Sequence, residues 1–308
     1  MKIVTLTLNP AFDMHCHMSI FKPRHENLAE VTALDTGGKG VNISRALMEN
    51  GADNLAVVIV GEENGDAFCK ALEKDGLRVS AVTTAGRIRE NITLHPENDA
   101  ETRISFDGFV CGKEILEEVR ARVGDTNENT IVTLTGSNPK GITVQDVTEM
   151  LTKMKQTGAK IVIDSRSFML EELLAFRPWL IKPNKDEAET YTGKKIERPQ
   201  DAVEIASQIY RAGVENVIVS LGGDGAVLAC KAGVFYAQTP AVEIASTIGA
   251  GDSLIAGFVD GYAKGLPIER VFARAVSFGT AACMQEGTRP PKAKQVAEIE
   301  PRVRVQKL

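Results

Sequence analysis

The chain has 308 residues, 43% of them hydrophobic and 25% charged, and a formal net charge of −5. This composition is typical of a globular protein, and the length allows one large α/β domain or two smaller ones. Because aromatic residues make up only 5% and no basic cluster stands out, we expect no nucleic-acid partner. The sequence has no long apolar run, no signal-like leader and five scattered cysteines without a CxxC pair. We therefore predict a cytoplasmic protein with reduced thiols and no membrane association.

Short β-branched runs alternate with helical patterns from one end of the chain to the other. Strands are predicted at residues 3–8, 55–60, 131–134, 160–164, 179–182 and 216–221. Helices are predicted at residues 40–50, 65–74, 113–123, 143–157, 200–212, 251–264 and 268–284, the fourth with Thr143 as its N-cap. Nearly all-apolar strands, each followed by a helix, are typical of a parallel sheet covered on both faces. We predict one doubly wound α/β domain over residues 1–308, with ligands at the carboxyl ends of its strands.

Two segments, at about residues 13–34 and 87–107, break this rhythm because they are too polar for buried parallel strands. The second contains an apolar stretch at 91–95, a turn cluster at 96–100 and a further stretch at 101–106, which predicts a hairpin. Together the two segments predict a small antiparallel lid. An exposed apolar lid face is often covered by a second subunit, so we expect a homodimer through the lid.

Two motifs near the amino terminus predict contacts with a sugar. Asp13 follows the first strand, and a carboxylate there can accept hydrogen bonds from two sugar hydroxyls; an ordinary turn aspartate has the same sequence. Residues 37–42 (GGKGVN) precede a helix. The glycines let backbone amides approach a sugar or its phosphate, with Asn42 as a hydroxyl partner. The alternative is a tight turn that caps the helix, and no Walker A pattern occurs in the chain.

Arginines and a serine are candidates for holding a phosphate on the substrate. Arg87, Arg89 and Arg103 lie in the predicted lid, and Arg87 and Arg89 alternate, so a strand would aim both at one face. A guanidinium can grip a phosphate with two parallel hydrogen bonds, although most surface arginines do not. Ser137 follows the strand at 131–134 and offers a hydroxyl and nearby amides; an ordinary strand-to-helix turn is the alternative.

Two further segments suit a nucleotide. Asn184 and Glu187 lie three residues apart where a helix begins, which suits a shared Mg²⁺–water shell near the phosphates of ATP. Capping of that helix by Asn184, with Glu187 in its first turn, has the same sequence. Residues 220–226 (SLGGDGA) end another apolar strand and could wrap a nucleotide phosphate or ribose. As a glycine-rich hairpin turn, they would need no ligand.

Residues 247–253 (TIGAGDS) come directly before an apolar helical run. Gly249 and Gly251 let backbone N–H groups point at an anion, and the helix N-terminus adds roughly half a positive charge. A carboxylate in such a pocket, Asp252, makes chemical sense if it takes a proton from the group that attacks a phosphate. The motif therefore predicts a phosphoryl-transfer site with a general base.

In this order and at these intervals, the motifs resemble the PfkB/ribokinase family of carbohydrate kinases over essentially the whole chain. The resemblance rests on residues 5–10 (TLTLNP) with Asp13, 37–42, 136–137 (GS), 182–184 (KPN) with Glu187, 220–222 (SLG) and 248–253 (IGAGDS). Residues 7–13, 27–28, 38–42 and 86–91 are most similar to the 1-phosphofructokinase branch, and the tagatose-6-phosphate kinase branch shares much of this pattern. The chain departs from the family where Asn138 replaces the Leu of Gly-Ser-Leu-Pro and where Arg166 follows Asp164-Ser165 in place of a serine.

The resemblance implies a ribokinase-like Rossmann-type αβα core with a small antiparallel β-sheet lid, and a role for each motif. It implies Asp252 as the catalytic base and the amides of Gly249, Ala250 and Gly251 as the anion hole. It implies that the sugar is bound by Asp13, Gly38, Lys39 and Asn42, and its phosphate by Arg87, Arg89 and Ser137. It implies that the nucleotide is bordered by Lys182, Asn184, Ser220, Gly222, Gly225 and Ser277. Asn184 and Glu187 would organise Mg²⁺ through water.

The same resemblance implies an ATP- and Mg²⁺-dependent kinase that converts D-fructose 1-phosphate to D-fructose 1,6-bisphosphate. A tagatose-6-phosphate kinase or a 6-phosphofructokinase of the same family is the alternative, because sequence distinguishes poorly between positions of a phosphate on a sugar. A non-catalytic sugar-phosphate-binding protein is an alternative of another class. Loss of Asp252, Glu187 or the anion-hole glycines would favour it, and all of them are present.

Overall fold

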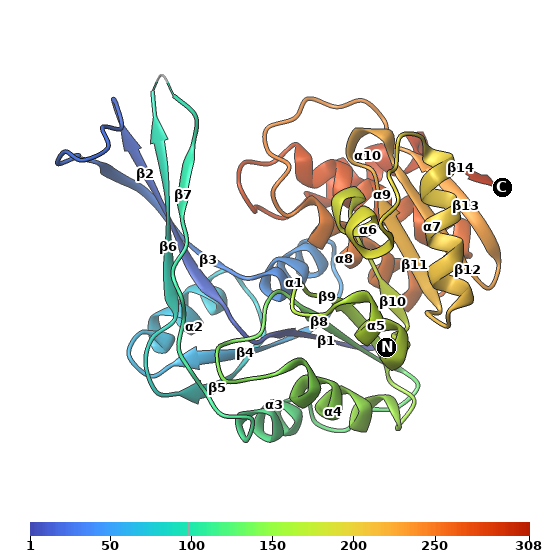
Figure 1. Ribbon diagram of the computed structural model, residues 1–308, viewed down its shortest axis with the longest axis horizontal. Helices are drawn as coiled ribbons and strands as arrows, with labels where there is room; N and C mark the ends of the chain where they lie inside the picture. Colours follow the sequence, from blue (N-terminus) through green and yellow to red (C-terminus); the bar gives the residue numbers. More distant parts are fainter. Residues whose placement is uncertain (98) are drawn as a thin grey trace.

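The computed structural model describes residues 1–97 and 99–308, and in them a ten-stranded sheet forms the centre of the molecule (Figure 1). From one edge to the other, its strands are β14 (Arg304–Lys307), β13 (Gly233–Gln238), β12 (Ala226–Cys230), β11 (Asn216–Ser220), β10 (Leu180–Ile181), β9 (Lys160–Asp164), β8 (Thr130–Thr135), β1 (Lys2–Thr7), β4 (Leu55–Gly61) and β5 (Val79–Thr84). The strands from β11 to β5 pair in parallel, whereas β12, β13 and β14 extend the sheet antiparallel.

Helices cover both faces of this sheet. One layer consists of α1 (Lys39–Glu49), α8 (Ala250–Ala263), α9 (Ile268–Cys283) and α10 (Ala293–Ile299). The other consists of α2 (Gly65–Lys74), α3 (Ile115–Val123), α4 (Val144–Lys155), α5 (Leu170–Phe176), α6 (Lys185–Thr192) and α7 (Pro199–Arg211). Short 3₁₀ turns occur at η1 (Gly222–Asp224) and η2 (Glu300–Arg302).

Alternation within the strands explains the two layers. Ile131 packs into the hydrophobic cluster beneath α8 and α9, whereas Val132 packs into the cluster beneath α3 and α4. Because successive strand residues point to opposite faces, a strand with both faces covered must be apolar throughout. The predicted doubly wound αβα core is therefore confirmed. Thr143 also caps α4 as predicted, in a capping box with Asp146.

A separate four-stranded sheet, the lid, projects from the core at the left of Figure 1. Its order is β3 (Glu30–Gly37), β2 (Ala11–Met18), β6 (Arg89–Pro96) and β7 (Thr102–Ile104). The predicted hairpin is confirmed by the antiparallel pairing of β6 with β7; its predicted turn includes Asn98, which lies outside the described residues. The sequence predicted an antiparallel lid. This is wrong for one pair of its strands, because β2 and β6 pair in parallel. Within the lid, Cys16, Met18 and Leu94 form a small hydrophobic cluster that is separate from the two clusters of the core.

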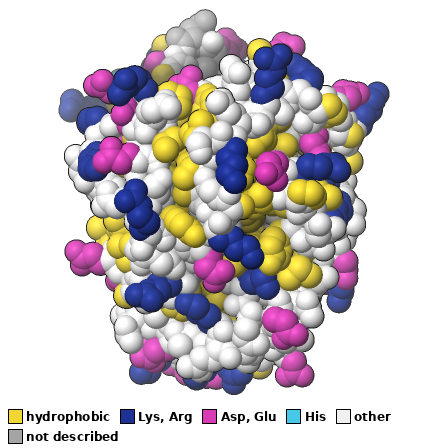
Figure 2. All heavy atoms as spheres, turned by 90° about the vertical axis from the view of Figure 1, so that its right-hand side faces the viewer, with side chains coloured by type: hydrophobic (Ala, Val, Ile, Leu, Met, Phe, Trp, Pro, Cys, Tyr) yellow, Lys and Arg dark blue, Asp and Glu magenta, His cyan; other side chains and the backbone are white. Residues whose placement is uncertain are grey.

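Figure 2 shows the end of the molecule that lies on the right in Figure 1, where positive, negative and apolar side chains are interspersed. The edge strand β14 carries exposed Arg304 and Lys307, and charged side chains on an edge strand discourage pairing with another chain. Within residues 1–97 and 99–308, each helix is too short or too polar to cross a membrane.

Candidate functional site

Asp252 lies in the first turn of α8, at the carboxyl-end edge of the parallel strands. Gly249 is the N-cap, and its φ of +78° is a left-handed conformation that glycine adopts readily. The side chain of Asp252 is 6% exposed, and Asn42 Nδ2 of α1 donates a hydrogen bond of 2.9 Å to its Oδ2. Burial raises the pKa of Asp252 to about 6, against the lowering effect of Lys39. A buried carboxylate with this pKa is suited to accept a proton near neutral pH.

A buried ammonium group lies beside the same helix turn. A Cβ atom on Gly251 would lie 3.0 Å from Lys182 Nζ, so glycine allows the lysine to approach the backbone. Lys182 is 5% exposed. The N-terminal amides of α8 and this ammonium therefore create a positive environment next to Asp252, as an anion hole requires.

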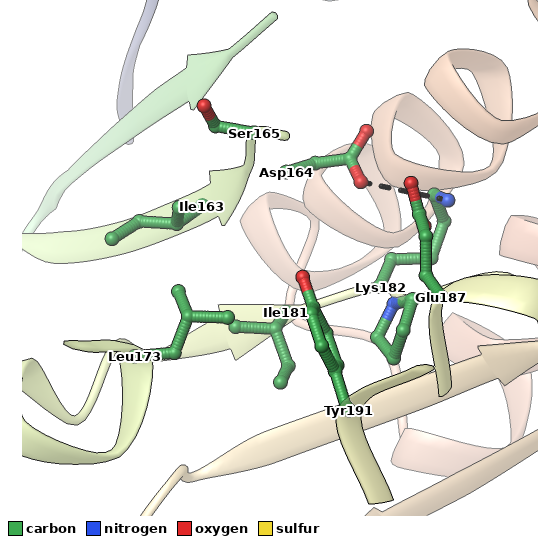
Figure 3. Close-up of a pocket in the computed structure, with 9 residues that line it drawn as sticks. Ile163, Asp164, Ser165, Leu173, Ile181, Lys182, Glu187 and Tyr191 are labelled. Carbon is green, nitrogen blue, oxygen red and sulfur yellow. Dashed lines mark ion pairs between the residues drawn. The ribbon is translucent and has the colours of Figure 1, made fainter. Parts of the chain in front are cut away.

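Asp164, at the end of β9, joins two lysines of the site. Lys39 Nζ lies 2.9 Å from Asp164 Oδ2, and Lys182 Nζ lies 3.7 Å from Oδ1; Figure 3 shows Asp164 facing Lys182. Although burial raises the pKa of Asp164, Lys182 and Lys39 outweigh it and hold that pKa below its ordinary value. Sequence reasoning did not select Asp164 as a site residue. A carboxylate ending an apolar parallel strand was the signal that could have found it.

Asn184 and Glu187 form a capping box at the start of α6. Asn184 Oδ1 accepts from the amide of Glu187 at 2.8 Å, and Glu187 Oε2 accepts from the amide of Asn184 at 3.0 Å. Glu187 also lines the pocket of Figure 3 with Asp164, Lys182 and Tyr191. In the described part of the chain, no three His, Cys, Asp or Glu side chains gather closely enough to enclose a metal. The single carboxylate of Glu187 still fits Mg²⁺, which keeps several waters and takes phosphate ligands.

The residues predicted to bind the sugar come from the lid and from the turn before α1. Gly38 has φ +138°, and a Cβ there would lie 2.6 Å from Thr7 Cγ2. Asp13 Oδ1 accepts hydrogen bonds from Asn91 at 2.9 Å and Arg103 at 2.5 Å. A Cβ on Gly37 would lie 2.5 Å from Asp13 Oδ2, so Asp13 of the lid lies against the turn that leads into α1.

Buried polar atoms without a hydrogen-bond partner gather at the carboxyl-end edge of the parallel strands. They are Thr7 Oγ1, Asn9 Oδ1, Asn42 Oδ1 and Thr135 Oγ1; in the described residues a fifth such atom, Asn54 Oδ1, lies before β4, away from this edge. Leaving a buried polar atom unpaired costs about 1–3 kcal/mol, so such a group is typical of a place where a polar ligand or water binds. Asn42 is especially informative because its amide holds Asp252 while its oxygen has no partner among the described residues.

The predicted phosphate residues separate into two sets. Arg89 is half-buried and donates to the carbonyls of Asn9 and Pro10 at 3.3 Å. Ser137 lies on the same side, because its Oγ accepts from Asn9 Nδ2 at 3.2 Å. Arg87 does not share a strand face with Arg89: β6 begins only at Arg89, and Arg87 pairs with Glu90 and Glu63 instead.

Of the residues predicted to border the nucleotide, Ser220 lies next to the start of α6, and Gly222 begins the 3₁₀ turn η1 two residues later. Residues 184 and 220 form a parallel bridge, and the amide of Ser220 donates to the carbonyl of Pro183 at 3.1 Å. Gly225 has a structural reason of its own: φ is +94°, and a Cβ would collide with the carbonyl oxygen of Ala237. This hairpin therefore needs glycine there whether or not a nucleotide binds.

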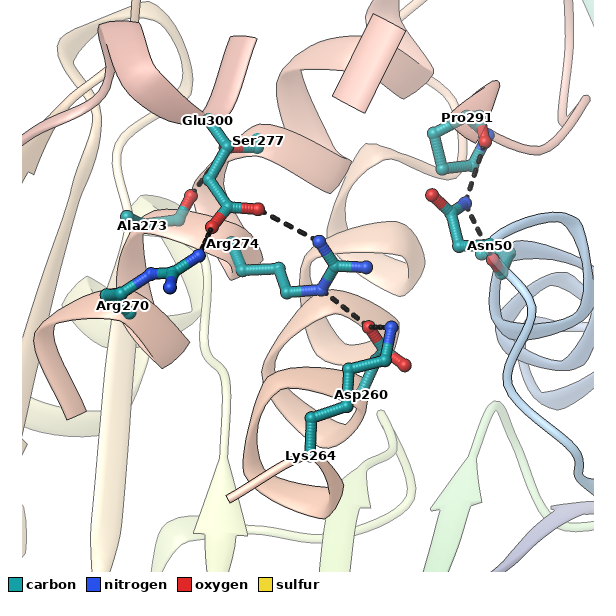
Figure 4. A network of polar contacts seen from close by, with 10 residues as sticks. Asn50, Asp260, Lys264, Arg270, Ala273, Arg274, Ser277, Pro291 and Glu300 are labelled. Atoms are coloured by element: carbon teal, nitrogen blue, oxygen red, sulfur yellow. Dashed lines mark hydrogen bonds and ion pairs between the residues drawn. The ribbon is translucent and has the colours of Figure 1, made fainter. Parts of the chain in front are cut away.

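The predicted contact of Ser277 with the nucleotide is not supported by its position. Its side chain is fully buried in α9, and its hydroxyl donates to the carbonyl of Ala273 at 2.6 Å (Figure 4). The helical pattern located α9 correctly, but it did not show that this serine faces the core.

Ion pairs behind the site fix α8 against α9 (Figure 4). Buried Asp260 accepts from Arg274 at 2.5 Å and from Lys264 at 2.8 Å, and Arg274 also pairs with Glu300 at 2.9 Å. A Cβ on Gly257 would lie 2.7 Å from the carbonyl of Arg274, so the two helices pack at close range. This packing holds the helix that carries Asp252 in a fixed position.

Comparison with known proteins agrees with this arrangement. Residues 14–295 match the pfkB family carbohydrate kinase domain. The chain is 31% identical to the 1-phosphofructokinase of Bacillus subtilis, over 99% of this chain and 100% of that protein. It is 29% identical to the 1-phosphofructokinase of Escherichia coli K12, over 97% of each. The crystal structure of phosphofructokinase-2 from Escherichia coli in complex with potassium superposes with a TM-score of 0.91, at 25% identity and 98% coverage of both chains.

Proposed function

This chain belongs to the pfkB family of carbohydrate kinases, and on that premise we propose that it transfers the γ-phosphoryl group of ATP to the 6-hydroxyl of D-fructose 1-phosphate. The products are D-fructose 1,6-bisphosphate and ADP. The observation that carries this proposal is the buried carboxylate of Asp252, with a pKa raised to about 6, in the first turn of α8. Similarity to relatives named 1-phosphofructokinase supports the choice of sugar.

Asp252 acts as the general base in this mechanism. Its carboxylate accepts the proton of the 6-hydroxyl, so the sugar oxygen can attack the γ-phosphorus while the bond to the β-phosphate oxygen breaks. Asn42 orients the carboxylate through its 2.9 Å hydrogen bond. Asn42 Oδ1, unpaired among the described residues, accepts from a sugar hydroxyl.

The amides of Gly249, Ala250 and Gly251, with Lys182 beside them, stabilise the negative charge on the transferring phosphoryl group. Mg²⁺ would be held by the ATP phosphates and, through water, by Glu187, and would neutralise charge on the β- and γ-phosphates. Asn184, Ser220 and Gly222 border the nucleotide. The capping box does not exclude this role, because it leaves Glu187 at the pocket that Lys182 also lines.

The lid supplies Asp13 and Arg89 to the acceptor. Asp13 binds sugar hydroxyls with Gly38 and Lys39, while Arg89 and Ser137 hold the phosphate that the sugar already carries. Arg87 is left out of this assignment because Glu63 and Glu90 already pair with it.

The lid also carries the proposed dimer interface. Ile20, Leu28, Val31, Leu34, Ile104 and Phe106 are exposed on its strands and connections. Apolar side chains gathered on a small sheet are typical of a surface that another subunit covers. We assign this surface to a second copy of the chain.

Similarity to phosphofructokinase-2 from Escherichia coli, which has been solved in complex with fructose 6-phosphate, favours one second candidate, phosphorylation of that sugar phosphate. A coupled ADP-release assay over fructose 1-phosphate, fructose 6-phosphate, tagatose 6-phosphate, fructose and ribose tests the choice. Fructose 1-phosphate should give the highest kcat/KM. A higher value for another sugar phosphate replaces the named substrate, and ATP consumption with any of them excludes a non-catalytic binding protein.

A further inference from the structure

We propose that Arg166 completes, with Arg89, the subsite for the phosphate already present on the acceptor, and that it helps to select phosphorylated over unphosphorylated sugars. This inference rests on the proposed function, since it concerns the acceptor of that same reaction. It assigns a role to a residue at which this chain departs from its family's usual pattern.

Hydrogen bonds place the Arg166 loop next to the predicted phosphate residues. Arg166 follows β9, and its neighbour Ser167 accepts through Oγ from the amide of Asn138 at 3.0 Å. Asn9 Nδ2 donates to the carbonyl of Asn138 at 3.4 Å. Arg89 in turn donates to the carbonyl of Asn9 at 3.3 Å. The loops after β1, β8 and β9 and the start of β6 therefore form one connected edge, with Ser137 among them.

The charges at this edge are unbalanced. Burial lowers the pKa of Arg89; among the neighbouring charges, Asp13 and Asp107 raise that pKa, while Arg103 and Arg166 lower it. The nearby acids are engaged: Asp13 pairs with Arg103 at 2.5 Å, and Asp107 pairs with Lys140 at 2.6 Å. In residues 1–97 and 99–308, no ion pair or side-chain hydrogen bond forms on the exposed side chain of Arg166.

Arg103 and Arg166 both lie close enough to act on the charge of Arg89, and a dianion bound beside these guanidinium groups would offset their positive charge. A phosphate monoester is such an anion, and the planar guanidinium matches its oxygens with two parallel hydrogen bonds. The acceptor phosphate is favoured over those of ATP because Arg89 and Arg103 belong to the lid strands, where Arg103 binds Asp13. The positive groups beside α8 are Lys182 and Lys39, and Asp164 holds both of them.

The test compares Arg166→Gln with the wild type and with Arg122→Gln, a matched control that removes an exposed arginine from α3. An ADP-release assay gives kcat and KM for ATP and for whichever sugar phosphate the wild type uses best, and the rate with fructose. In Arg166→Gln, the KM for the sugar phosphate should rise roughly 10- to 100-fold, the loss expected for one charge-assisted contact. The KM for ATP and the rate with fructose should not change. Arg166→Lys keeps the positive charge but lacks the planar guanidinium, so its KM for the sugar phosphate should lie between those of the wild type and Arg166→Gln.

Each alternative outcome has a distinct meaning. A sugar-phosphate KM within twofold of wild type in Arg166→Gln overturns the inference and leaves the proposed function standing. An increase confined to the KM for ATP assigns the residue to the nucleotide and also overturns it. A wild type that phosphorylates no sugar phosphate contradicts the inference and the proposed function together. Thermal unfolding of the variants checks folding, and the exposed side chain predicts an unchanged Tm.

Discussion

Replacement of Asp252 by asparagine should make the ligand-free protein more stable and the enzyme much slower. The folded-state pKa of about 6 lies above the ordinary value of 3.8, because burial penalises the charged carboxylate. This gap corresponds to roughly 3 kcal/mol, since each tenfold change in proton affinity is worth about 1.36 kcal/mol. Asparagine carries no charge and can still accept the hydrogen bond from Asn42 through its own oxygen.

The size of the stability gain depends on pH. Because folding favours the protonated carboxyl, burial of Asp252 does not lower the unfolding free energy of the wild type below about pH 4. The loss of unfolding free energy develops mainly between about pH 4 and 6 and is complete above about pH 7. Asp252→Asn should therefore gain up to roughly 3 kcal/mol of unfolding free energy at pH 8, about half of that at pH 5, and little near pH 4. The kcat should fall by roughly 10²- to 10⁴-fold, the usual contribution of a general base.

Urea unfolding at pH 5 and 8 and an ADP-release assay measure both effects. In the wild type, kcat/KM should decline as pH falls through about 6, because the base becomes protonated. Asp66→Asn is the control; its side chain is 81% exposed, so stability should change by less than about 0.5 kcal/mol. Near-wild-type turnover in Asp252→Asn would refute the assignment of the base. Equal stability of the two proteins at pH 8 would refute the argument from burial.

Two further predictions concern the core of the site and the lid. Asp164→Ala leaves buried Lys182 without its carboxylate and should cost roughly 3–5 kcal/mol at pH 7. Because the folded-state pKa of Asp164 is lowered, the loss of unfolding free energy in Asp164→Ala should become smaller as pH falls below about 4. An unfolding free energy from urea titration within about 1 kcal/mol of wild type at pH 7 would argue against a buried ion pair. Light scattering should give twice the 33.2 kDa of one chain, and Leu34→Glu should give a monomer. A molecular mass of one chain for the wild type would contradict the proposed dimer through the lid.

The alternation of apolar runs with helical patterns was enough to predict the αβα core, but not every strand of its sheet. Strands such as β1 and β8 are buried on both faces and have a continuous apolar signal. Strands β5, β13 and β14 are only partly buried, so their mixed sequences gave no such signal. Strand β12 was also missed, although it is apolar and fully buried, because it begins at the last residue of the segment at 220–226 that was interpreted as a turn. Sequence patterns report burial most clearly where both faces are covered.

The site shows a similar division. The N-terminus of α8 was predictable because Gly249, Gly251 and Asp252 lie within four consecutive residues. For Asp164 the sequence offered only a carboxylate at the end of a strand, because the role of Asp164 comes from Lys39 and Lys182, which the fold brings from distant parts of the chain. Asn184 and Glu187 show a third case, because a capping box and a metal-water shell use the same atoms at the same spacing.

The substrate panel tests the central claim most directly. With purified protein, ATP and Mg²⁺, ADP release should be fastest by kcat/KM with fructose 1-phosphate, and the product should carry its new phosphate on the 6-hydroxyl. Activity confined to unphosphorylated fructose or ribose would contradict the account, because the arginines around Asn9 and Ser137 would then hold no substrate phosphate.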